Sequence, residues 1–578
     1  MSDLNVEKIK SESRALRGTL HDSLADPTTG AIAPGDTVVS KFHGIYQQDD
    51  RDARTERRDA RLEPLYQFML RVRIPGGRVT RAQWQALDRL ADKYANGTLR
   101  LTSRQAIQFH GISRESLRDL VRGIDAVGMD SLAACGDVNR NVMCHVQPEL
   151  GGLHADTLDW AARLSAHLTP ATAAWREIWI DGEKVGLEGG DEAGEDEPIY
   201  GRAYLPRKFK VGIAVPPSND IDVFSQDLGF IAIEDDCNDE RGHNHHDKRR
   251  LAGFNVVAGG GMGCSHGEPD TFPLLGRVIG FIEPEQMLEL AEAVVTAQRD
   301  FGDRSNRKHA RFKYTLDDHG TDWLLEQIRQ RSEIELQPAR PFEFTHSGDA
   351  FGWTERADGH LQCTVFVENG RIGPRQRAGL MELIERHLED FRVTPNQNLV
   401  LTGIEPSSRE AVGDLLAEFD LEGGGRRSVL RKHSMACVAL PTCGLAMAEA
   451  ERYLPDLITR IEELAAQHEI EDQPINIRMS GCPNGCSRPY LGEIGLVGRA
   501  PGRYNLYLGA AFNGERLNRL VMDNVDEAAI LDAVDGWFRR YSAERDAGET
   551  FGNFSVRSGL VAAVVHGSEV NAPASDRP

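Results

Sequence analysis

The sequence predicts an α+β fold made of two related halves that meet at a central seam. The main observation is a repeat: residues 99–112 read LRLTSRQAIQFHGI and residues 391–404 read FRVTPNQNLVLTGI, and both fit R-[LV]-T-x-x-Q-x-[IL]-x-[FL]-x-G-I. Flanking motifs recur in the same order, with GGRVT (76–80) matching NGRIG (369–373) and SRESLRDLV (113–121) matching SREAVGDLL (408–416). Because three blocks keep their order and nearly their spacing, chance is a poor explanation.

The elements of the first half follow from their patterns. FMLRVRIP (68–75) alternates like a strand. Thr80 starts a helix with Gln83 as its capping-box partner, and Gly97 ends it. We expect residues 99–109 to form the next strand. A second helix follows, with one apolar face made of Leu117, Leu120, Val121 and Ile124.

The second half repeats this order. The patterns predict a strand at 363–368, a helix at 375–389, a strand at 391–402 and a helix at 408–419. A weaker repeat relates GFNVVAGGG (253–261) to RYNLYLGAA (503–511). A seam between two such halves is a natural place for a large ligand. The alternative is that the duplication serves stability alone.

Composition limits the functions that the chain can have. It has 578 residues, is 40% apolar and 27% charged, and carries a formal net charge of −22, which argues against general nucleic-acid binding. No apolar run approaches the roughly 18 residues that span a bilayer. The first 18 residues are polar and mixed in charge, so we expect a cytoplasmic protein without a membrane partner.

Two segments look like solvated insertions rather than functional sites. Residues 186–198 are acidic and Gly-rich. Residues 234–250 form a charge run that contains Cys237, His243, His245 and His246. These side chains could bind a metal, but the lack of apolar anchors favours a loop.

Four of the nine cysteines fall into two close pairs. Cys437 and Cys443 have C-x5-C spacing, and Cys482 and Cys486 have C-x3-C spacing with Gly485 between them. Four thiolates can hold Zn²⁺ or an iron–sulfur cluster. Zinc usually favours tighter C-x2-C pairs, so the spacing modestly favours a cluster. Buried thiols without a metal are the third possibility.

The sequences around these cysteines, SMACVALPTC and GCPNGCSRP, resemble those of the sulfite and nitrite reductase haemoprotein family. The resemblance runs from about Arg14 to about Val565. It includes FHGIYQQDDRD (42–52), LEPLYQFMLRVRIPGG (62–77), DVNRNVMC (137–144), YLPRKFK (204–210) and GLVGRAPGRYNLYLG (495–509). It is strongest toward the NADPH-dependent assimilatory sulfite reductase haemoprotein (beta) branch.

The resemblance implies a duplicated fold with ferredoxin-like half-modules and two larger α/β modules around a cofactor seam. It implies a sirohaem and a [4Fe–4S] cluster ligated by the four cysteines above, with Cys486 also bridging to the sirohaem iron. Gly444 stands where Pro is common in the family. The expected domains are an N-terminal extension (1–60), two half-modules (61–135, 346–425), a sirohaem- and sulfite-binding module (136–345) and a cluster module (426–578).

A polyanionic tetrapyrrole needs many cations, and Arg binds carboxylates bidentately. In the predicted strand 99–109, alternation would place Arg100, Thr102, Arg104, Gln108 and His110 on one face. A solvated strand face is the alternative. In the second copy the residues equivalent to Arg104, Gln108 and His110 are Asn396, Val400 and Thr402. We therefore expect the cofactor to bind mainly against the first half. The resemblance assigns this strand, and also Arg207, Arg311 and Asn484, to sirohaem.

The resemblance assigns a second set of residues to the substrate: Arg71, Arg140, Lys208 and Lys210. Sulfite is an anion, and binding it needs focused positive charge. A lysine among other cations has a lowered pKa and suits a proton donor. We expect Arg71 and Arg73 to point the same way as each other, and likewise Lys208 and Lys210. Nitrite-specific relatives typically have Asn where Lys210 stands, which favours sulfite as the substrate.

The source of electrons must lie outside this chain. GGGMGCSHG (259–267) fails the G-x-G-x-x-G spacing, and no other convincing nucleotide or flavin fingerprint appears. The resemblance implies an NADPH-oxidising flavoprotein (alpha) subunit carrying FAD and FMN, for six-electron reduction of sulfite to sulfide in cysteine biosynthesis. The alternatives are a ferredoxin-dependent sulfite or nitrite reductase and, more remotely, a non-catalytic zinc-binding scaffold.

Overall fold

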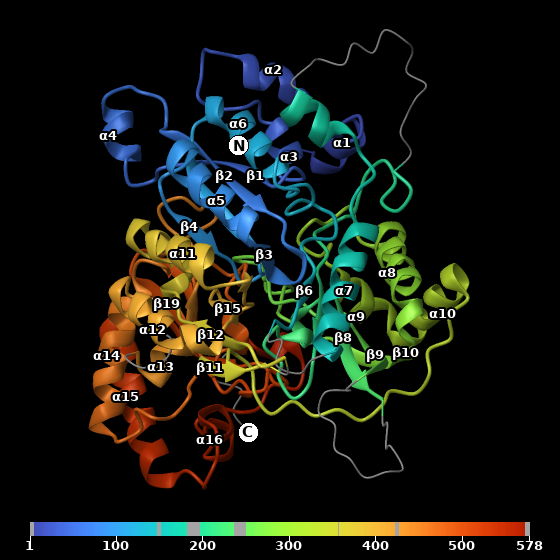
Figure 1. Ribbon diagram of the computed structural model, residues 1–578. Coiled ribbons are helices and arrows are strands. Elements are labelled where there is room, and N and C mark those ends of the chain that lie inside the picture. The colour runs from blue at the N-terminus through green and yellow to red at the C-terminus, as the bar shows by residue number, and fades with distance from the viewer. Residues whose placement is uncertain are drawn as a thin grey trace.

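The computed structural model describes residues 5–146, 152–181, 197–235, 250–356, 358–421 and 427–572. Within these ranges the strands form four five-stranded sheets (Figure 1). The two sheets whose strands come from residues 45–112 and 352–404 are called the small sheets, and the two from residues 143–282 and 434–525 are called the large sheets, each with its module. The members of each pair have the same strand order and directions, so the predicted duplicated α+β fold is confirmed. The acidic and the His-rich insertions lie largely outside the described residues.

The two small sheets exchange one strand with each other. The first has the order β1-β2-β5-β4-β13, and the second has the order β11-β12-β15-β14-β3. Strand β13 comes from the second half but pairs with β4, and β3 comes from the first half but pairs with β14. The bounds are β1 (Ile45–Asp49), β2 (Tyr66–Val72), β3 (Arg78–Thr80), β4 (Leu99–Leu101), β5 (Ile107–Ile112), β11 (Gly352–Glu355), β12 (Leu361–Val365), β13 (Arg371–Ile372), β14 (Asp390–Val393) and β15 (Leu399–Ile404).

One helix from each half lies at the junction of the small sheets. Helix α5 (Arg81–Tyr94) begins with the predicted capping box between Thr80 and Gln83, and its partner α11 (Pro374–Arg386) packs beside it (Figure 1). Arg377 of α11 is buried and donates hydrogen bonds to Asp88 and Asp92 of α5. The outer helices are α6 (Leu117–Asp125), whose predicted apolar face is buried, and α12 (Arg409–Glu418).

The two large sheets also share one plan, with two parallel pairings followed by two antiparallel ones. The weak repeat predicted between 253–261 and 503–511 falls on the equivalent strands β9 and β19. The bounds are β6 (Met143–Cys144), β7 (Val211–Ala214), β8 (Leu228–Glu234), β9 (Leu251–Ala258) and β10 (Arg277–Ile282), then β16 (Ser434–Ala436), β17 (Ile477–Ser480), β18 (Ile494–Ala500), β19 (Arg503–Leu508) and β20 (Arg519–Val525).

The remaining helices accompany the large sheets and the N-terminal region (Figure 1). Those of the first large module are α7 (Gly152–His167), α8 (Met287–Phe301), α9 (Phe312–His319) and α10 (Thr321–Ser332). Those of the second are α13 (Val429–Lys432), α14 (Leu454–Gln467), α15 (Glu527–Glu544) and α16 (Phe551–Arg557). The N-terminal helices are α1 (Val6–Ser11), α2 (Leu20–Ala25), α3 (Asp36–Val39) and α4 (Arg54–Asp59). In the described part of the chain, no helix combines the length and apolarity needed to cross a membrane.

One prediction about the repeat blocks is wrong. The pattern predicts one strand for each of residues 99–109 and 391–402, but each forms an antiparallel hairpin whose turn holds the repeated T-x-x-Q segment. The turn requires a left-handed backbone at its glutamine, with φ 51° at Gln105 and 70° at Gln397. Both glutamines donate side-chain hydrogen bonds to main-chain carbonyls, which stabilises this conformation.

Candidate functional site

A cavity lies where the first small sheet meets the second large module. About 1360 Å³ of space within it, including its open mouth, is free of protein atoms. Its walls carry all four paired cysteines and a group of basic side chains from distant parts of the sequence. The predicted site residues on its walls are Arg71, Arg100, Thr102, Gln108, His110, Arg140, Arg207, Lys208, Cys437, Cys443, Cys482, Asn484 and Cys486.

The parallel strands β16 and β17 place the cysteines. Cys437 directly follows β16, and Cys482 follows β17 after a single glycine, so both lie at the carboxyl edge of the sheet. Gly481 donates its backbone N–H to the Cys437 Sγ at 3.3 Å. Gly485 adopts φ 62° in the turn between Cys482 and Cys486, where a side chain would be strained.

The donor set fits an iron–sulfur cluster better than a single metal ion. Four sulfur ligands around one Zn²⁺ would lie about 3.8 Å apart, since Zn–S bonds are about 2.3 Å long. Among the described residues, no three His, Cys, Asp or Glu side chains converge closely enough to hold one ion. The four thiols instead surround a shared space, which suits a larger inorganic core.

The environment of the thiols shows why they need a cationic partner to ionise. Burial, and then the neighbouring Cys486, raise the pKa of Cys482 to about 12, and the same causes raise the pKa of Cys437 and Cys443. The backbone and side-chain N–H groups of Asn484 act in the opposite direction on Cys482. Bound iron would supply the positive charge that four crowded thiolates require.

The first-half hairpin forms another wall of the cavity, in contact with the cysteine-bearing segment. Arg100 on β4 and Gln108 on β5 are direct cross-strand partners, and His110 lies two residues beyond Gln108. Arg100 is 3% exposed; it pairs with Glu451 at 2.7 Å and donates to the carbonyl of Ala436, the residue before Cys437. Arg100 therefore joins this wall to the cysteine-bearing segment.

Arg104 does not share this wall, because it belongs to the turn and not to a continuous strand. Its guanidinium donates to the side chain of Gln226 at 2.7 Å and to the carbonyl of Asn141 at 3.2 Å. Burial, and then the positive charge of Arg488, lower its pKa to about 9. Arg104 thus lies behind the cavity and not on its wall.

The cations predicted to bind the substrate form two layers. Arg71, Arg140 and Lys208 line the cavity, together with Arg207. Lys210 lies behind them, among Arg104, Lys208 and Arg311, and Arg311 pairs with the buried Asp227 at 2.9 Å. Burial lowers the pKa of both lysines well below the ordinary value. Neighbouring cations add to this effect, with Arg140 acting on Lys208 and Arg104 on Lys210. Within the described ranges, neither lysine forms a salt bridge.

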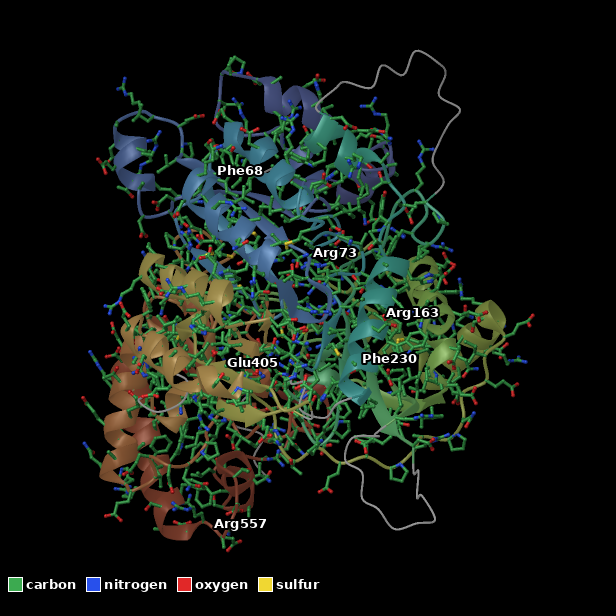
Figure 2. All side chains as sticks on the ribbon, viewed as in Figure 1. Phe68, Arg73, Arg163, Phe230, Glu405 and Arg557 are labelled. Atoms are coloured by element: carbon green, nitrogen blue, oxygen red, sulfur yellow. The ribbon has the colours of Figure 1, made fainter. Side chains whose placement is uncertain are left out.

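The prediction that Arg71 and Arg73 point the same way is wrong. Strand β2 ends at Val72. The side chain of Arg73, which is labelled in Figure 2, pairs with Asp130 and donates a hydrogen bond to Ser165 of α7. Of the two arginines, only Arg71 lines the cavity, and its guanidinium contacts the buried Cys135. When the Gln108 amide is oriented so that both of its ends are hydrogen-bonded, Arg71 also donates to the Gln108 oxygen at 2.6 Å.

These features fit a polyanionic cofactor. His110 is buried against the cavity, and its Nδ1 atom has no hydrogen-bond partner among the described residues. Burial, and then Arg371 and Arg100, lower the pKa of His110 well below its ordinary value. An anionic ligand would compensate the unpaired lysines and give the imidazole a partner.

Several wall residues were missed by the sequence reasoning. Lys41, Tyr46 and Arg307 line the cavity, and Asp137 beside them pairs with Arg307 at 2.8 Å. Tyr46 lies in FHGIYQQDDRD, one of the family-like motifs, and that signal could have identified it. Arg307 lies in no recognised motif, and only the packing of the chain brings it to the site.

Comparisons with known proteins agree with this geometry. A family model described as the nitrite/sulfite reductase ferredoxin-like half domain matches residues 61–127 and 354–419. A second, the nitrite and sulphite reductase 4Fe-4S domain, matches residues 159–336. The four cysteines lie outside that second match, in the other copy of the same sheet plan.

Curated relatives match over nearly the whole chain. A "Sulfite reductase [NADPH] hemoprotein beta-component" from Myxococcus xanthus is 53% identical over 96% of both chains. A protein of the same name from Geobacillus kaustophilus is 52% identical over 98% of this chain and 97% of its own. The solved structure of the NirA protein of Mycobacterium tuberculosis covers 96% of each chain with a TM-score of 0.77 and 23% identity, and so shares the fold.

Proposed function

The chain belongs to the nitrite and sulfite reductase family, and from this premise we propose that it reduces sulfite to sulfide in a six-electron reaction, using sirohaem and a [4Fe–4S] cluster. One observation carries the proposal: four thiols from the second half of the chain and a group of mostly half-buried cations from the first half line one cavity. On this proposal the duplication would serve ligand binding and not stability alone.

The cysteines would hold the cluster, and Cys486 would also face the sirohaem iron. Cys486 is the exposed member of the set, with the other three buried or partly buried. This exposure into the cavity suits a thiolate shared between two groups. Around it, Arg100, Thr102, Gln108, His110, Arg207 and Asn484 would contact the sirohaem, while Arg104 and Arg311 would act from behind.

The basic side chains would bind the oxyanion and supply protons. When bound, the coupled centres would supply electrons and a coordination position for the sulfur atom. Arg71 and Arg140 would hold the sulfite oxygens as permanent cations. Lys208, with its lowered pKa, would donate a proton to a departing oxygen, and Lys210 would maintain the positive potential behind it.

The electron donor would be a separate flavoprotein. The relatives are named as beta components of an NADPH-dependent enzyme, which implies an alpha component as partner.

We assign the cofactor and substrate contacts to the predicted modules 61–135, 136–345 and 426–578, with 346–425 completing the pseudo-symmetric half and 1–60 wrapping the core.

The test combines composition with kinetics. The purified protein is expected to contain iron and acid-labile sulfide and to show a reduced-porphyrin absorption spectrum with iron–sulfur features. Steady-state assays with sulfite and nitrite are expected to give the higher kcat/KM for sulfite. A colourless protein that contains zinc would refute the proposal, and a preference for nitrite would reassign the substrate.

A further inference from the structure

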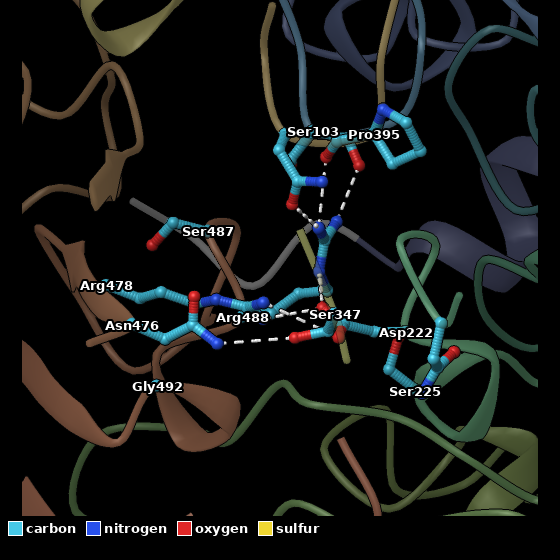
Figure 3. Close-up of polar contacts among 12 residues, drawn as sticks. Ser103, Asp222, Ser225, Ser347, Pro395, Asn476, Arg478, Ser487, Arg488 and Gly492 are labelled. Atoms are coloured by element: carbon cyan, nitrogen blue, oxygen red, sulfur yellow. Dashed lines mark hydrogen bonds and ion pairs between the residues drawn. The ribbon is translucent and has the colours of Figure 1, made fainter. Parts of the chain in front are cut away.

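A buried arginine two residues after Cys486 contacts segments from both halves of the chain. Arg488 is 5% exposed, and its backbone is left-handed with φ 54°. Its Nη1 donates to the carbonyl of Ser103 at 2.7 Å and its Nη2 to the carbonyl of Pro395 at 3.0 Å, while its Nε pairs with Asp222 (Figure 3).

The two carbonyls belong to equivalent turns of the repeat. Ser103 lies in the TSRQ turn of the first hairpin, and Pro395 lies in the TPNQ turn of the second. One guanidinium therefore joins the two turns to the segment that carries Cys486. The first turn also contacts that segment directly, because the Ser103 Oγ donates to the carbonyl of Cys486 at 2.8 Å.

The carboxylate of Asp222 holds the arginine in place. It is fully buried and accepts from a second buried arginine, Arg478, through Nη1 at 2.5 Å (Figure 3). Arg478 and Arg488 share this carboxylate, but within the described residues Arg488 alone of the two hydrogen-bonds the hairpin turns. Arg478 is therefore a control with the same burial and the same charge partner.

We infer that Arg488 is a positioning residue that fixes Cys486 relative to both hairpin turns, and hence relative to the wall formed by Arg100, Gln108 and His110. Its planar fork can donate to two carbonyls and a carboxylate at once, which the single ammonium of lysine cannot do. The inference rests on the proposed role of Cys486 as the ligand shared by cluster and sirohaem.

The test compares Arg488→Lys with Arg478→Lys in the purified holoprotein. Each variant retains a cation for Asp222 but loses the planar guanidinium and its hydrogen bonds. Both variants are therefore expected to lower the unfolding midpoint. Only Arg488→Lys is expected to weaken the magnetic coupling between the centres in the electron paramagnetic resonance or Mössbauer spectrum. It should also accelerate iron release to a chelator by about tenfold or more, because each lost charge-assisted hydrogen bond is worth about that factor.

The outcomes separate this inference from the proposed function. If the wild-type protein shows no coupled centre, the proposed function fails. If the wild-type protein is coupled and Arg488→Lys matches Arg478→Lys in both coupling and iron release, the positioning role is overturned.

A milder variant covers the case in which Arg488→Lys does not fold. Arg488→Gln keeps one amide donor for a turn carbonyl, cannot contact both turns, and leaves Asp222 paired with Arg478, so the fold should persist. Faster iron release than in the wild type supports the inference, and an unchanged rate contradicts it.

Discussion

Glu451 joins the cysteine-bearing module to two adjacent strands of the first small sheet, and replacing it with glutamine should destabilise the protein strongly. Its carboxylate pairs with Arg100 on β4 at 2.7 Å and with Arg371 on β13 at 2.7 Å, and its side chain is 14% exposed. Its backbone N–H donates to the carbonyl of Cys437 at 3.1 Å. Glu451→Gln would leave two adjacent arginines without their counter-ion.

Loss of one partner from a buried pair costs about 3–5 kcal/mol. For a cooperative unit of roughly 150–250 residues, this corresponds to a fall of roughly 6–20 °C in the unfolding midpoint. Differential scanning calorimetry at neutral pH measures the fall. The control is Glu449→Gln, because Glu449 pairs with Arg452 at the surface, with side chains 29% and 47% exposed, and should cost no more than about 1 kcal/mol.

The pH dependence gives a second check on the same residue. Burial alone would raise the pKa of Glu451, but Arg100 and Arg371 outweigh it, so the pKa is lowered from 4.5. A carboxylate with a lowered pKa stabilises the fold above its unfolded pKa, and this stabilisation is lost as pH falls through the folded pKa. The difference between wild type and Glu451→Gln should shrink below about pH 4.5. Equal midpoints for the two glutamine variants at neutral pH would refute the reasoning.

Three further substitutions test the site. Cys486→Ser should abolish sulfide production from sulfite while leaving the unfolding midpoint of the cofactor-free protein nearly unchanged, and near-normal turnover with both cofactors present would contradict the role of this thiolate. Arg71→Met should lower kcat/KM for sulfite by roughly 10- to 100-fold, because a charge-assisted hydrogen bond contributes about 1.5–3 kcal/mol. Its control, Arg73→Met, should lower stability because it removes the ion pair with Asp130, but it should leave kcat/KM nearly unchanged. Equal losses of kcat/KM in the two variants would argue against the assignment of Arg71 to the substrate. Lys210→Asn should reduce sulfite turnover more than nitrite turnover, and an unchanged ratio of the two kcat/KM values would disprove its part in substrate choice.

The sequence predicted the duplication because the repeat preserves turn and core residues that both copies need. The capping box at Thr80 and the apolar face of α6 depend on local spacing, and both are confirmed. The hairpins were not predicted, because R-x-T-x-x-Q-x-[IL] alternates like a strand while its glutamine adopts a left-handed backbone. Arg73 and Arg104 were misplaced for a related reason: alternation fixes direction only within an unbroken strand.

The remaining site residues depend on long-range packing. Arg307 and Lys41 reach the cavity from segments far apart in the sequence, and no local pattern relates them to the cysteines. The assignment of individual residues to sirohaem or sulfite stays a prediction that the variants above address.

The exchange of β3 and β13 between the small sheets bears on how such a chain could have arisen. Each half supplies the other with an edge strand, and the exchanged pairs Arg371–Arg100 and Arg392–Arg78 are equivalent under the repeat. An ancestral single-copy polypeptide with this arrangement would therefore have been a strand-swapped homodimer, with gene fusion later joining its subunits. By the same geometry, a chain cleaved between α10 and β11 would yield two fragments whose small sheets each lack one edge strand until the fragments reassociate.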